Sequence, residues 1–312
     1  MAETGIETRL VYGFMDAGKT TYIRECVMND YFCRYGTTLI LCFEEGEEAY
    51  DAEALRARNT SVAYHDGAED VGAFCARCIA ASRPDRIYVE MNTMMQGLRE
   101  RFPDSMRVAS AVTWLDWETL PLYFVNFRQM IGQMVAVSQQ VTFRGCPSKA
   151  LLAPYGSAFR VMNRKASYLR QDPMGYHEKA FDLFLPFSLE GKEIAVGAAE
   201  FVPLWLDAYD HPEHYADKTI RFTEPLELRR GGEDGARSAG RVVMACCMAD
   251  LQFMAFELEG PDGPDGGWAV FDALARVGTD AYGQRKLKLR PNGFRSAPPP
   301  DPPILDLKSA GS

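Results

Sequence analysis

The chain has 312 residues, of which 47% are hydrophobic and 25% charged, and its formal net charge is -9 at pH 7. These fractions are typical of a globular protein, and the length is enough for two domains that each bury a core. The acidic balance argues against a general nucleic-acid-binding surface, because neutralising phosphates requires a basic face.

The sequence also bears on the cellular location of the protein and on the state of its cysteines. No apolar stretch is long enough to span a bilayer, and residues 1–4 lack the basic and apolar regions of a secretory signal. We therefore expect a cytoplasmic protein without direct membrane insertion. Its eight cysteines are then better read as reduced thiols or metal ligands than as a disulfide framework.

The most informative segment is residues 13–21, Gly-Phe-Met-Asp-Ala-Gly-Lys-Thr-Thr, which matches the phosphate-loop pattern Gly-x4-Gly-Lys-[Ser/Thr]. A short apolar strand over 9–12 and a helix over 20–28 give the motif the context that it needs. In such a loop, backbone N–H groups and the helix N-terminus bind phosphates, while the lysine and threonine serve the terminal phosphates and Mg²⁺. The residues predicted to bind a nucleoside triphosphate are Gly13, Asp16, Ala17, Gly18, Lys19, Thr20 and Thr21, with Thr20 as the Mg²⁺ ligand.

Strand and helix patterns alternate after the loop. We predict strands over 37–43, 61–64, 87–90, 108–114, 141–143 and 166–169, and helices over 68–81, 124–137 and 149–163. Such alternation is typical of a mostly parallel sheet with helices on both sides. The fold class is therefore α/β, with a P-loop nucleotide-binding domain over 1–180.

Helical periodicity fades from about residue 181 onward, and short alternating runs take over at 219–222, 241–244 and 268–271. Polar turn-rich loops separate these runs at 229–235 and 260–267. The pattern predicts a linker over 181–212 and a small β-barrel-like domain over 213–296. The proline-rich segment 297–312 is expected to be an extended tail outside the packed core.

Over residues 8–170, the loop, the acidic turn 45–47 and the later strands resemble the CobW-like GTPases, a P-loop family that includes metallochaperones. The family's loop, Gly-Phe-x-x-[Ala/Ser]-Gly-Lys-Thr-Thr, is matched at every position. By this resemblance, the turn Glu45-Gly46-Glu47 and the strand-end Glu90 would surround Mg²⁺ and the attacking water, which makes Lys19, Glu45 and Glu90 the candidate catalytic residues. The alternative for Glu44, Glu47 and Glu48 is that they are merely solvated at a strand end.

Two departures from the family bear on function. Its Cys-x-Cys-Cys metal motif is missing, and the position of the guanine-recognition motif Asn-Lys-x-Asp reads Phe-Arg-Gly-Cys over 143–146. The base is therefore left open between GTP and ATP. The string Gly-Arg-x4-Cys-Cys-x2-Asp over 240–250 resembles an OB-like domain of an uncharacterised bacterial family that occurs alongside predicted permeases, which suggests a permease-associated or metalloprotein partner.

Cysteines and histidines supply the candidate metal ligands. Cys246, Cys247 and Asp250 could hold Zn²⁺ if the chain turns there, because neighbours on a regular strand point to opposite faces; the alternative is two small buried residues. Cys75 and Cys78 have the spacing of half a zinc site, but inside a helical run we favour packing. The cluster 211–214, His-Pro-Glu-His, is expected to face solvent.

The leading hypothesis is a CobW-like NTPase, with GTP as the favoured nucleotide, that couples Mg²⁺-dependent hydrolysis to metal or partner-protein handling. The alternative is a degenerate nucleotide scaffold or sensor that binds a protein or a metal without significant turnover. A kinase acting on a small molecule is a third class, since the loop does not specify the phosphoryl acceptor.

Overall fold

The computed structural model describes residues 5–29, 36–181, 185–231, 235–260, 263–280 and 283–307. The chain divides into two compact units: unit 1 comprises residues 1–152 and 163–181, and unit 2 comprises 153–162 and 182–312. The expectation for residues 1–4 falls outside the described residues, as do Cys33, parts of both turn-rich loops and 308–312. Within the described residues, no helix has the length and apolarity needed to cross a membrane.

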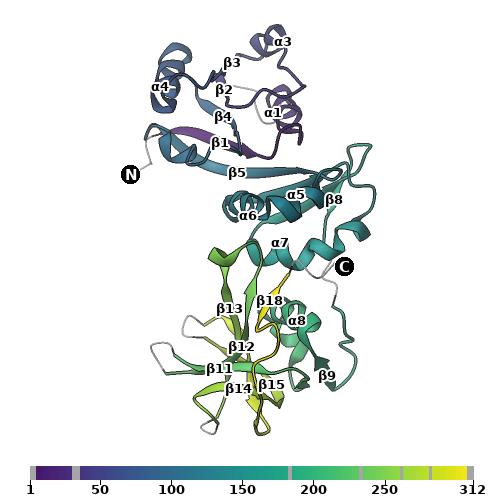
Figure 1. The fold of residues 1–312 in the computed structure, drawn as a ribbon. Coiled ribbons are helices and arrows are strands. Elements are labelled where there is room, and N and C mark those ends of the chain that lie inside the picture. Colours follow the sequence, from purple (N-terminus) through teal and green to yellow (C-terminus); the bar gives the residue numbers. More distant parts are fainter. Residues whose placement is uncertain are drawn as a thin grey trace. The chain divides into compact units, whose positions relative to one another are not determined.

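Unit 1 contains an eight-stranded sheet in the order β3-β2-β4-β1-β5-β6-β7-β8 (Figure 1). All neighbouring strands are parallel except β7 and β8, which pair antiparallel. The predicted α/β class is confirmed. The strands are β1 (Ile6–Tyr12), β2 (Thr38–Cys42), β3 (Thr60–Tyr64), β4 (Arg86–Glu90), β5 (Met106–Asp116), β6 (Gln140–Arg144), β7 (Ser167–Gln171) and β8 (His177–Lys179).

Helices pack on both faces of this sheet because its central strands are apolar on both sides. In β2, Leu39 and Leu41 pack in one core cluster with Phe74 of α4, whereas Ile40 packs in another with Ile23 of α1. Every residue of β2 is buried, as expected for a central parallel strand. Helices α1 (Lys19–Met28) and α3 (Ala52–Arg56) thus lie opposite α4 (Val71–Ser82) (Figure 1).

Two predicted helices of the first half differ from the structure. The expected helix 124–137 is interrupted at Phe127, where φ is -125° and ψ is 27°, so that α5 (Leu120–Asn126) ends and α6 (Arg128–Val137) begins. The expected helix 149–163 is a 3₁₀ helix, η2 (Lys149–Tyr155), followed by α7 (Gly156–Met162). Pro154, which has no N–H, lies inside η2, and α7 belongs to unit 2.

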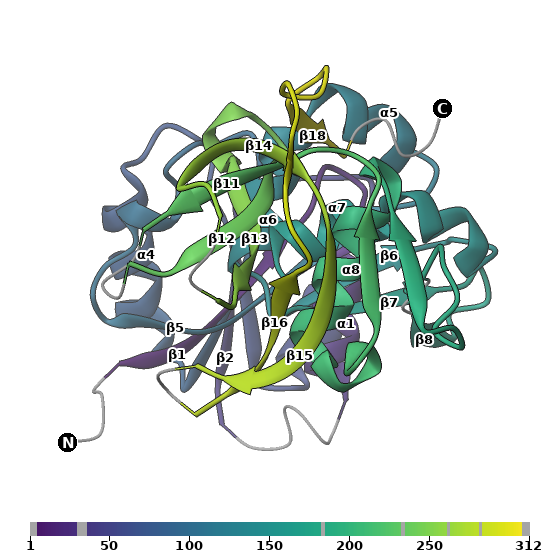
Figure 2. The ribbon, with the colours of Figure 1, turned by 90° about the horizontal axis from the view of Figure 1, so that it is seen from below.

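Unit 2 is built around a second sheet, in the order β17-β14-β11-β12-β13-β16-β15-β10-β9, with β18 paired to β12 (Figures 1 and 2). The sheet is mixed, because β9–β10, β13–β16 and β12–β18 are parallel pairs. The expected second sheet-rich domain is present. Its strands are β9 (Glu193–Val196), β10 (Thr219–Phe222), β11 (Leu226–Arg230), β12 (Arg237–Met244), β13 (Gln252–Leu258), β14 (Gly266–Val270), β15 (Asp272–Thr279), β16 (Arg285–Pro291), β17 (Arg295–Ser296) and β18 (Ile304–Asp306).

The segment 181–212, expected to be a linker, contributes β9 and the helix α8 (Ala198–Asp210) to unit 2. At the start of the helix, the Glu200 side chain accepts a hydrogen bond from the Gly197 N–H at 2.9 Å, which satisfies one backbone donor of the helix terminus. Its apolar face is buried in the core of the unit and comprises Phe201, Val202, Leu204, Leu206 and Ala208. Residues 193–210, which form β9 and α8, are therefore part of the folded core of unit 2.

Residues 297–307, which were expected to lie in an extended tail outside the packed core, also join unit 2. Strand β18 pairs in parallel with β12, with Val242 opposite Ile304. Leu305 and Leu307 are partly buried against the core. The prediction was wrong here because a three-residue strand after a proline run gives no periodic signal of its own.

Candidate nucleotide site

The phosphate loop connects β1 to α1 at the carboxyl edge of the sheet. Gly13, Asp16 and Gly18 have positive φ values of 152°, 58° and 98°. A Cβ on Gly13 would lie 2.6 Å from the carbonyl oxygen of Trp114, so only glycine fits there. Helix α1 begins without a side-chain cap and without an acidic residue in its first turn. Its positive end is therefore available to an anion.

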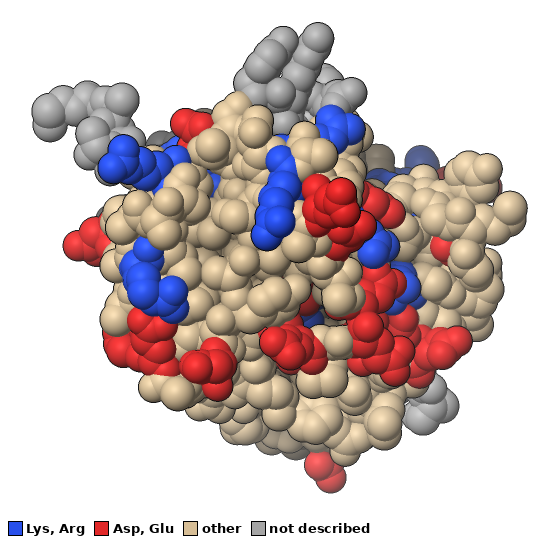
Figure 3. Space-filling view, turned by 90° about the horizontal axis from the view of Figure 1, so that it is seen from above, with Lys and Arg blue, Asp and Glu red and all other residues tan. Residues whose placement is uncertain are grey.

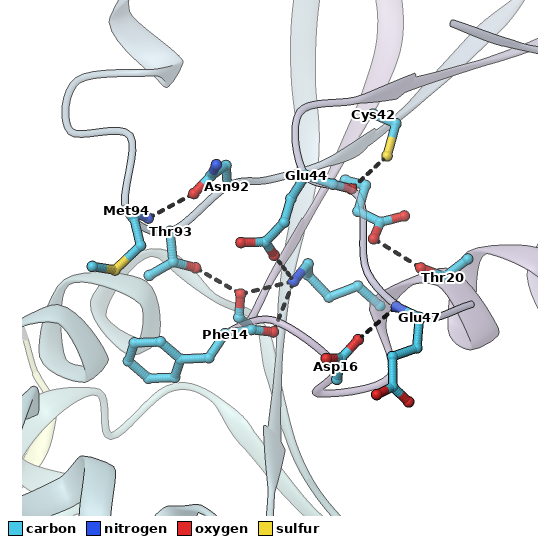
Figure 4. Close-up of polar contacts among 12 residues, drawn as sticks. Phe14, Asp16, Thr20, Cys42, Glu44, Glu47, Asn92, Thr93 and Met94 are labelled. Atoms are coloured by element: carbon cyan, nitrogen blue, oxygen red, sulfur yellow. Dashed lines mark hydrogen bonds and ion pairs between the residues drawn. The ribbon is translucent and has the colours of Figure 1, made fainter. Parts of the chain in front are cut away.

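Lys19 lies at the centre of the site and is only 3% exposed. Its Nζ donates hydrogen bonds to the carbonyl oxygens of Gly13, at 3.0 Å, and Phe14, at 2.8 Å. The same Nζ forms an ion pair with the buried carboxylate of Glu44 (Figure 4). The Thr93 hydroxyl also donates to the Gly13 carbonyl oxygen, at 2.7 Å (Figure 4). Glu44 thus provides the lysine with an internal anion.

Thr20 and Glu90 meet beside the lysine. The Thr20 hydroxyl donates to Oε1 of Glu90 at 2.8 Å, and the Tyr50 hydroxyl donates to Oε2 at 2.6 Å. Burial raises the pKa of Glu90, although both hydrogen bonds act to lower it. A hydroxyl next to a buried carboxylate supplies the hard oxygen ligands that Mg²⁺ prefers, so these residues fit the ion.

The acidic segment after β2 lies against the phosphate loop. The Glu47 N–H donates to Oδ1 of Asp16 at 3.0 Å (Figure 4). The Thr21 hydroxyl donates to Glu48 at 2.9 Å. A Cβ on Gly46 would lie 2.6 Å from the same Asp16 oxygen. Glycine at this position therefore allows the close approach of the two segments.

The structure brings most of the predicted site together, with Lys19, Thr20 and Glu90 converging on the phosphate loop. Glu45, a predicted catalytic residue, is exposed, whereas its neighbour Glu44 holds the lysine. Sequence reasoning missed Glu44 and Tyr50 as site residues. Glu44 could have been recognised from its position just after the carboxyl end of β2, because β2 is the direct neighbour of β4, which ends at Glu90.

Arg144 occupies the stretch where a guanine-recognition motif would be expected. It ends β6, and its guanidinium donates to the carbonyl oxygen of Asp16 at 3.1 Å. Its side chain also covers Gly18, where an added Cβ would lie 2.8 Å from the arginine Cδ. This stretch therefore contacts the phosphate loop itself.

The predicted zinc ligands Cys246, Cys247 and Asp250 do lie together at a turn, with ligand atoms within 4.8 Å of one another. However, the Asp250 carboxylate accepts hydrogen bonds from the N–H groups of Cys246, at 2.6 Å, and Cys247, at 3.0 Å. Burial raises the pKa of the Cys246 thiol to about 12. The Asp250 carboxylate is thus already engaged by the backbone of its own turn.

Cys75 and Cys78 are buried in the core of unit 1, as favoured from their helical setting. Burial raises the pKa of the Cys75 thiol to about 12. Among the described residues, neither cysteine belongs to a group of three or more side chains that could hold a metal ion. Besides Cys246, Cys247 and Asp250, one such group occurs there, formed by His211, Glu213 and His214.

Charged side chains are mixed on the face seen in Figure 3. Basic groups are scattered among acidic ones there, and the described residues of this face form no continuous basic field. This distribution agrees with the acidic net charge of the chain.

Comparisons with known proteins give similarity to solved structures alone. No protein-family model and no curated protein matches the chain. The hydrogenase maturation factor HypB from Archaeoglobus fulgidus is similar, with 15% sequence identity and a TM-score of 0.39, over 55% of this chain and 83% of that one. The Zn(II)-bound YjiA GTPase from E. coli is similar with 13% identity and a TM-score of 0.36, over 85% of this chain and 92% of that one. Values this low identify neither a family nor a site.

Proposed function

We propose that unit 1 binds a nucleoside triphosphate with Mg²⁺ and hydrolyses it. The observation that carries the proposal is the environment of Lys19, an almost fully buried ammonium paired with Glu44 beside an uncapped helix N-terminus. This arrangement suits an exchangeable anion, because a phosphate entering the loop replaces the carboxylate as the partner of the lysine.

Each site residue has a role in this proposal. Backbone N–H groups of 14–20 and Lys19 stabilise the charge that develops on the transferred phosphoryl group. Thr20 and Glu90 would hold Mg²⁺, which would supply neutralisation of phosphate charge. Tyr50 orients the Glu90 carboxylate through its hydrogen bond. Glu44, once displaced from Lys19, is placed to orient the attacking water, a role that the exposed Glu45 fits less well.

The finer part of the proposal follows the resemblance to CobW-like GTPases. The protein would use GTP, couple its hydrolysis to the handling of a metal or partner protein, and act in the cytoplasm. A permease-associated protein or a metalloprotein is the partner that unit 2 would serve, with Cys246, Cys247 and Asp250 as the less favoured Zn²⁺ ligands.

The test is release of phosphate from GTP and from ATP, with and without Mg²⁺, by the wild type and Lys19→Ala. We expect the substitution to lower phosphate release at least about 100-fold, because it removes a charge aimed at the reacting phosphates. Removing one partner of a buried ion pair also destabilises a fold, so the double variant Lys19→Met/Glu44→Gln is the control that leaves no buried charge unpaired.

The outcomes separate the candidate functions. Equal phosphate release by the wild type and both lysine variants would refute the proposed site. Nucleotide binding that Lys19→Ala abolishes, without phosphate release even when Zn²⁺, Co²⁺ or Ni²⁺ is added, would favour the sensor. Transfer of phosphate to an added small molecule rather than to water would favour the kinase.

A further inference from the structure

A second group of metal-ligating side chains lies in unit 2, where α8 ends. His211, Glu213 and His214 come from the end of this helix and from the 3₁₀ turn η3 (Pro212–Tyr215). Their ligand atoms all lie within 4.8 Å of one another. Two ligands of a tetrahedral zinc ion are about 3.4 Å apart, given metal–ligand bonds of about 2.1 Å. Binding a zinc ion would therefore require these side chains to move closer together.

The fully buried side chain of Asp207 contacts one member of the group, His214. Its Oδ2 lies 2.9 Å from Nδ1 of His214 and accepts a hydrogen bond from the Tyr215 hydroxyl at 2.7 Å. Histidines that bind metals commonly donate their second ring N–H to a carboxylate, which fixes the tautomer and raises the basicity of the other nitrogen. With Nδ1 engaged by Asp207, the free ligand atom of His214 is Nε2.

The placement of Asp207 is otherwise costly. The residue lies in the last turn of α8, where the helix dipole disfavours a negative charge. Its second oxygen, Oδ1, is buried and has no hydrogen-bond partner among the described residues. A cation bound to His214 would offset this buried charge through the imidazole ring.

His211 and Glu213 are exposed to solvent. The rings of His211 and His214 stack with centroids 4.9 Å apart, and Nδ1 of His211 lies 3.6 Å from Oε1 of Glu213. Arg285 lies 3.5 Å from the other oxygen of Glu213, and this exposed ion pair is weak enough to exchange for a metal. Two neutral imidazoles and one carboxylate form a ligand set that suits Zn²⁺.

We propose that His211, Glu213 and His214 bind a divalent cation of the Zn²⁺ class, with Asp207 as the positioning residue. Water or a further ligand completes the coordination. The proposal does not depend on the nucleotide site, because every residue in it belongs to unit 2.

The first test uses the full-length wild type without a histidine tag. The chain has four histidines, so ¹H–¹⁵N spectra of the imidazole rings can follow each one during a Zn²⁺ titration. We expect the signals of His211 and His214 to shift with saturation at one equivalent, while those of His65 and His177 stay in place. Unchanged signals for His211 and His214 at saturating Zn²⁺ would overturn the proposal without any substitution.

Calorimetric titration of variants is the second test. We expect His211→Ala and His214→Ala to bind Zn²⁺ at least tenfold more weakly than the wild type, and Glu213→Gln to be weakened by a smaller factor. His177→Ala, which removes another exposed histidine, should bind as the wild type does. Undiminished binding by His211→Ala, or Co²⁺ spectra in which thiolate absorption accounts for all the bound metal, would overturn the site.

Discussion

Lys19 and Glu44 form a buried ion pair between residues that lie 25 positions apart in the sequence. Their side chains are 2% and 6% exposed, so neither charge is well solvated. A buried charge that loses its partner typically costs about 3–5 kcal/mol. Removing either partner alone should therefore destabilise the loop, while the intact pair places Glu44 in competition with a phosphate for the lysine.

Glu44→Gln tests this competition. We expect the variant to have a lower unfolding temperature without nucleotide, because Lys19 then lacks its counter-charge. We also expect it to bind GTP or ATP about tenfold more tightly, which corresponds to about 1.4 kcal/mol. Fluorescence titration with a labelled nucleotide measures the affinity.

The matched control is Glu45→Gln, which removes the same charge from the exposed neighbouring position. It should leave both the affinity and the unfolding temperature nearly unchanged. If Glu45→Gln changes nucleotide binding and Glu44→Gln does not, the assignment of Glu44 as the internal anion is wrong.

Glu90 makes stability depend on pH. Burial raises its pKa in the folded protein, so the folded state binds this proton more tightly than the unfolded state does. The resulting stabilisation is fully present below the unfolded pKa of about 4.3 and is lost as pH rises through the raised folded value. Without divalent ions, the wild type should therefore lose stability relative to Glu90→Gln as pH rises.

Urea unfolding of both proteins between about pH 4 and pH 8 measures this difference, since the glutamine is neutral throughout. A difference in unfolding free energy that is constant over this range would show that Glu90 titrates alike in the folded and unfolded states.

At the scale of elements, β18 is the feature that the sequence described least well. It adds a parallel edge to β12, and Leu305 and Leu307 cover part of the core. We expect a chain that ends after Pro303 to unfold about 2–6 °C below a chain that ends after Leu307, because the shorter one exposes apolar surface and removes the partner of residues 242–244 on one edge of β12.

Ending the shorter chain after Pro303 keeps the carbonyl oxygen of Pro302, which accepts a hydrogen bond from the buried Arg241 at 3.3 Å. The comparison therefore isolates the strand from this second contact. Thermal unfolding followed by circular dichroism gives both temperatures, and equal values would mean that β18 adds nothing to the stability of unit 2.

Elements with strong local patterns were predicted well. Strand β2 is continuously apolar, and the prediction of 37–43 agrees with the observed Thr38–Cys42 within a residue at each end. The helix α8 was missed because Pro203 and the aromatic residues Phe201, Trp205 and Tyr209 weaken its helical signal. Burial in unit 2 compensates for this low propensity.

At the scale of the whole molecule, each unit has buried apolar clusters formed by its own residues. One buried cluster consists of unit 2 residues, including Val161 of α7, and two others consist of unit 1 residues. A ligand stabilises the unit that binds it by about 2.7 kcal/mol at one hundred times its dissociation constant. We therefore expect Mg²⁺ with GTP or ATP to raise the temperature of one calorimetric transition and Zn²⁺ to raise that of another.

The variant Lys19→Met/Glu44→Gln assigns the transitions, because it should lose the shift caused by nucleotide and keep the shift caused by Zn²⁺. A single transition that both ligands raise together would mean that the units unfold cooperatively, which contradicts the expectation.

The sequence by itself determined the phosphate loop, because Gly13, Gly18, Lys19 and Thr20 act through local backbone geometry and the start of one helix. It also determined the α/β class, which follows from local periodicity. Only the tertiary structure decided that Glu44 rather than Glu45 pairs with the lysine, since strand order brings the end of β2 to the loop. Likewise, only the tertiary structure showed which residues contact Asp207, α8 and β18. Contacts between distant segments depend on packing and register, which no local pattern records.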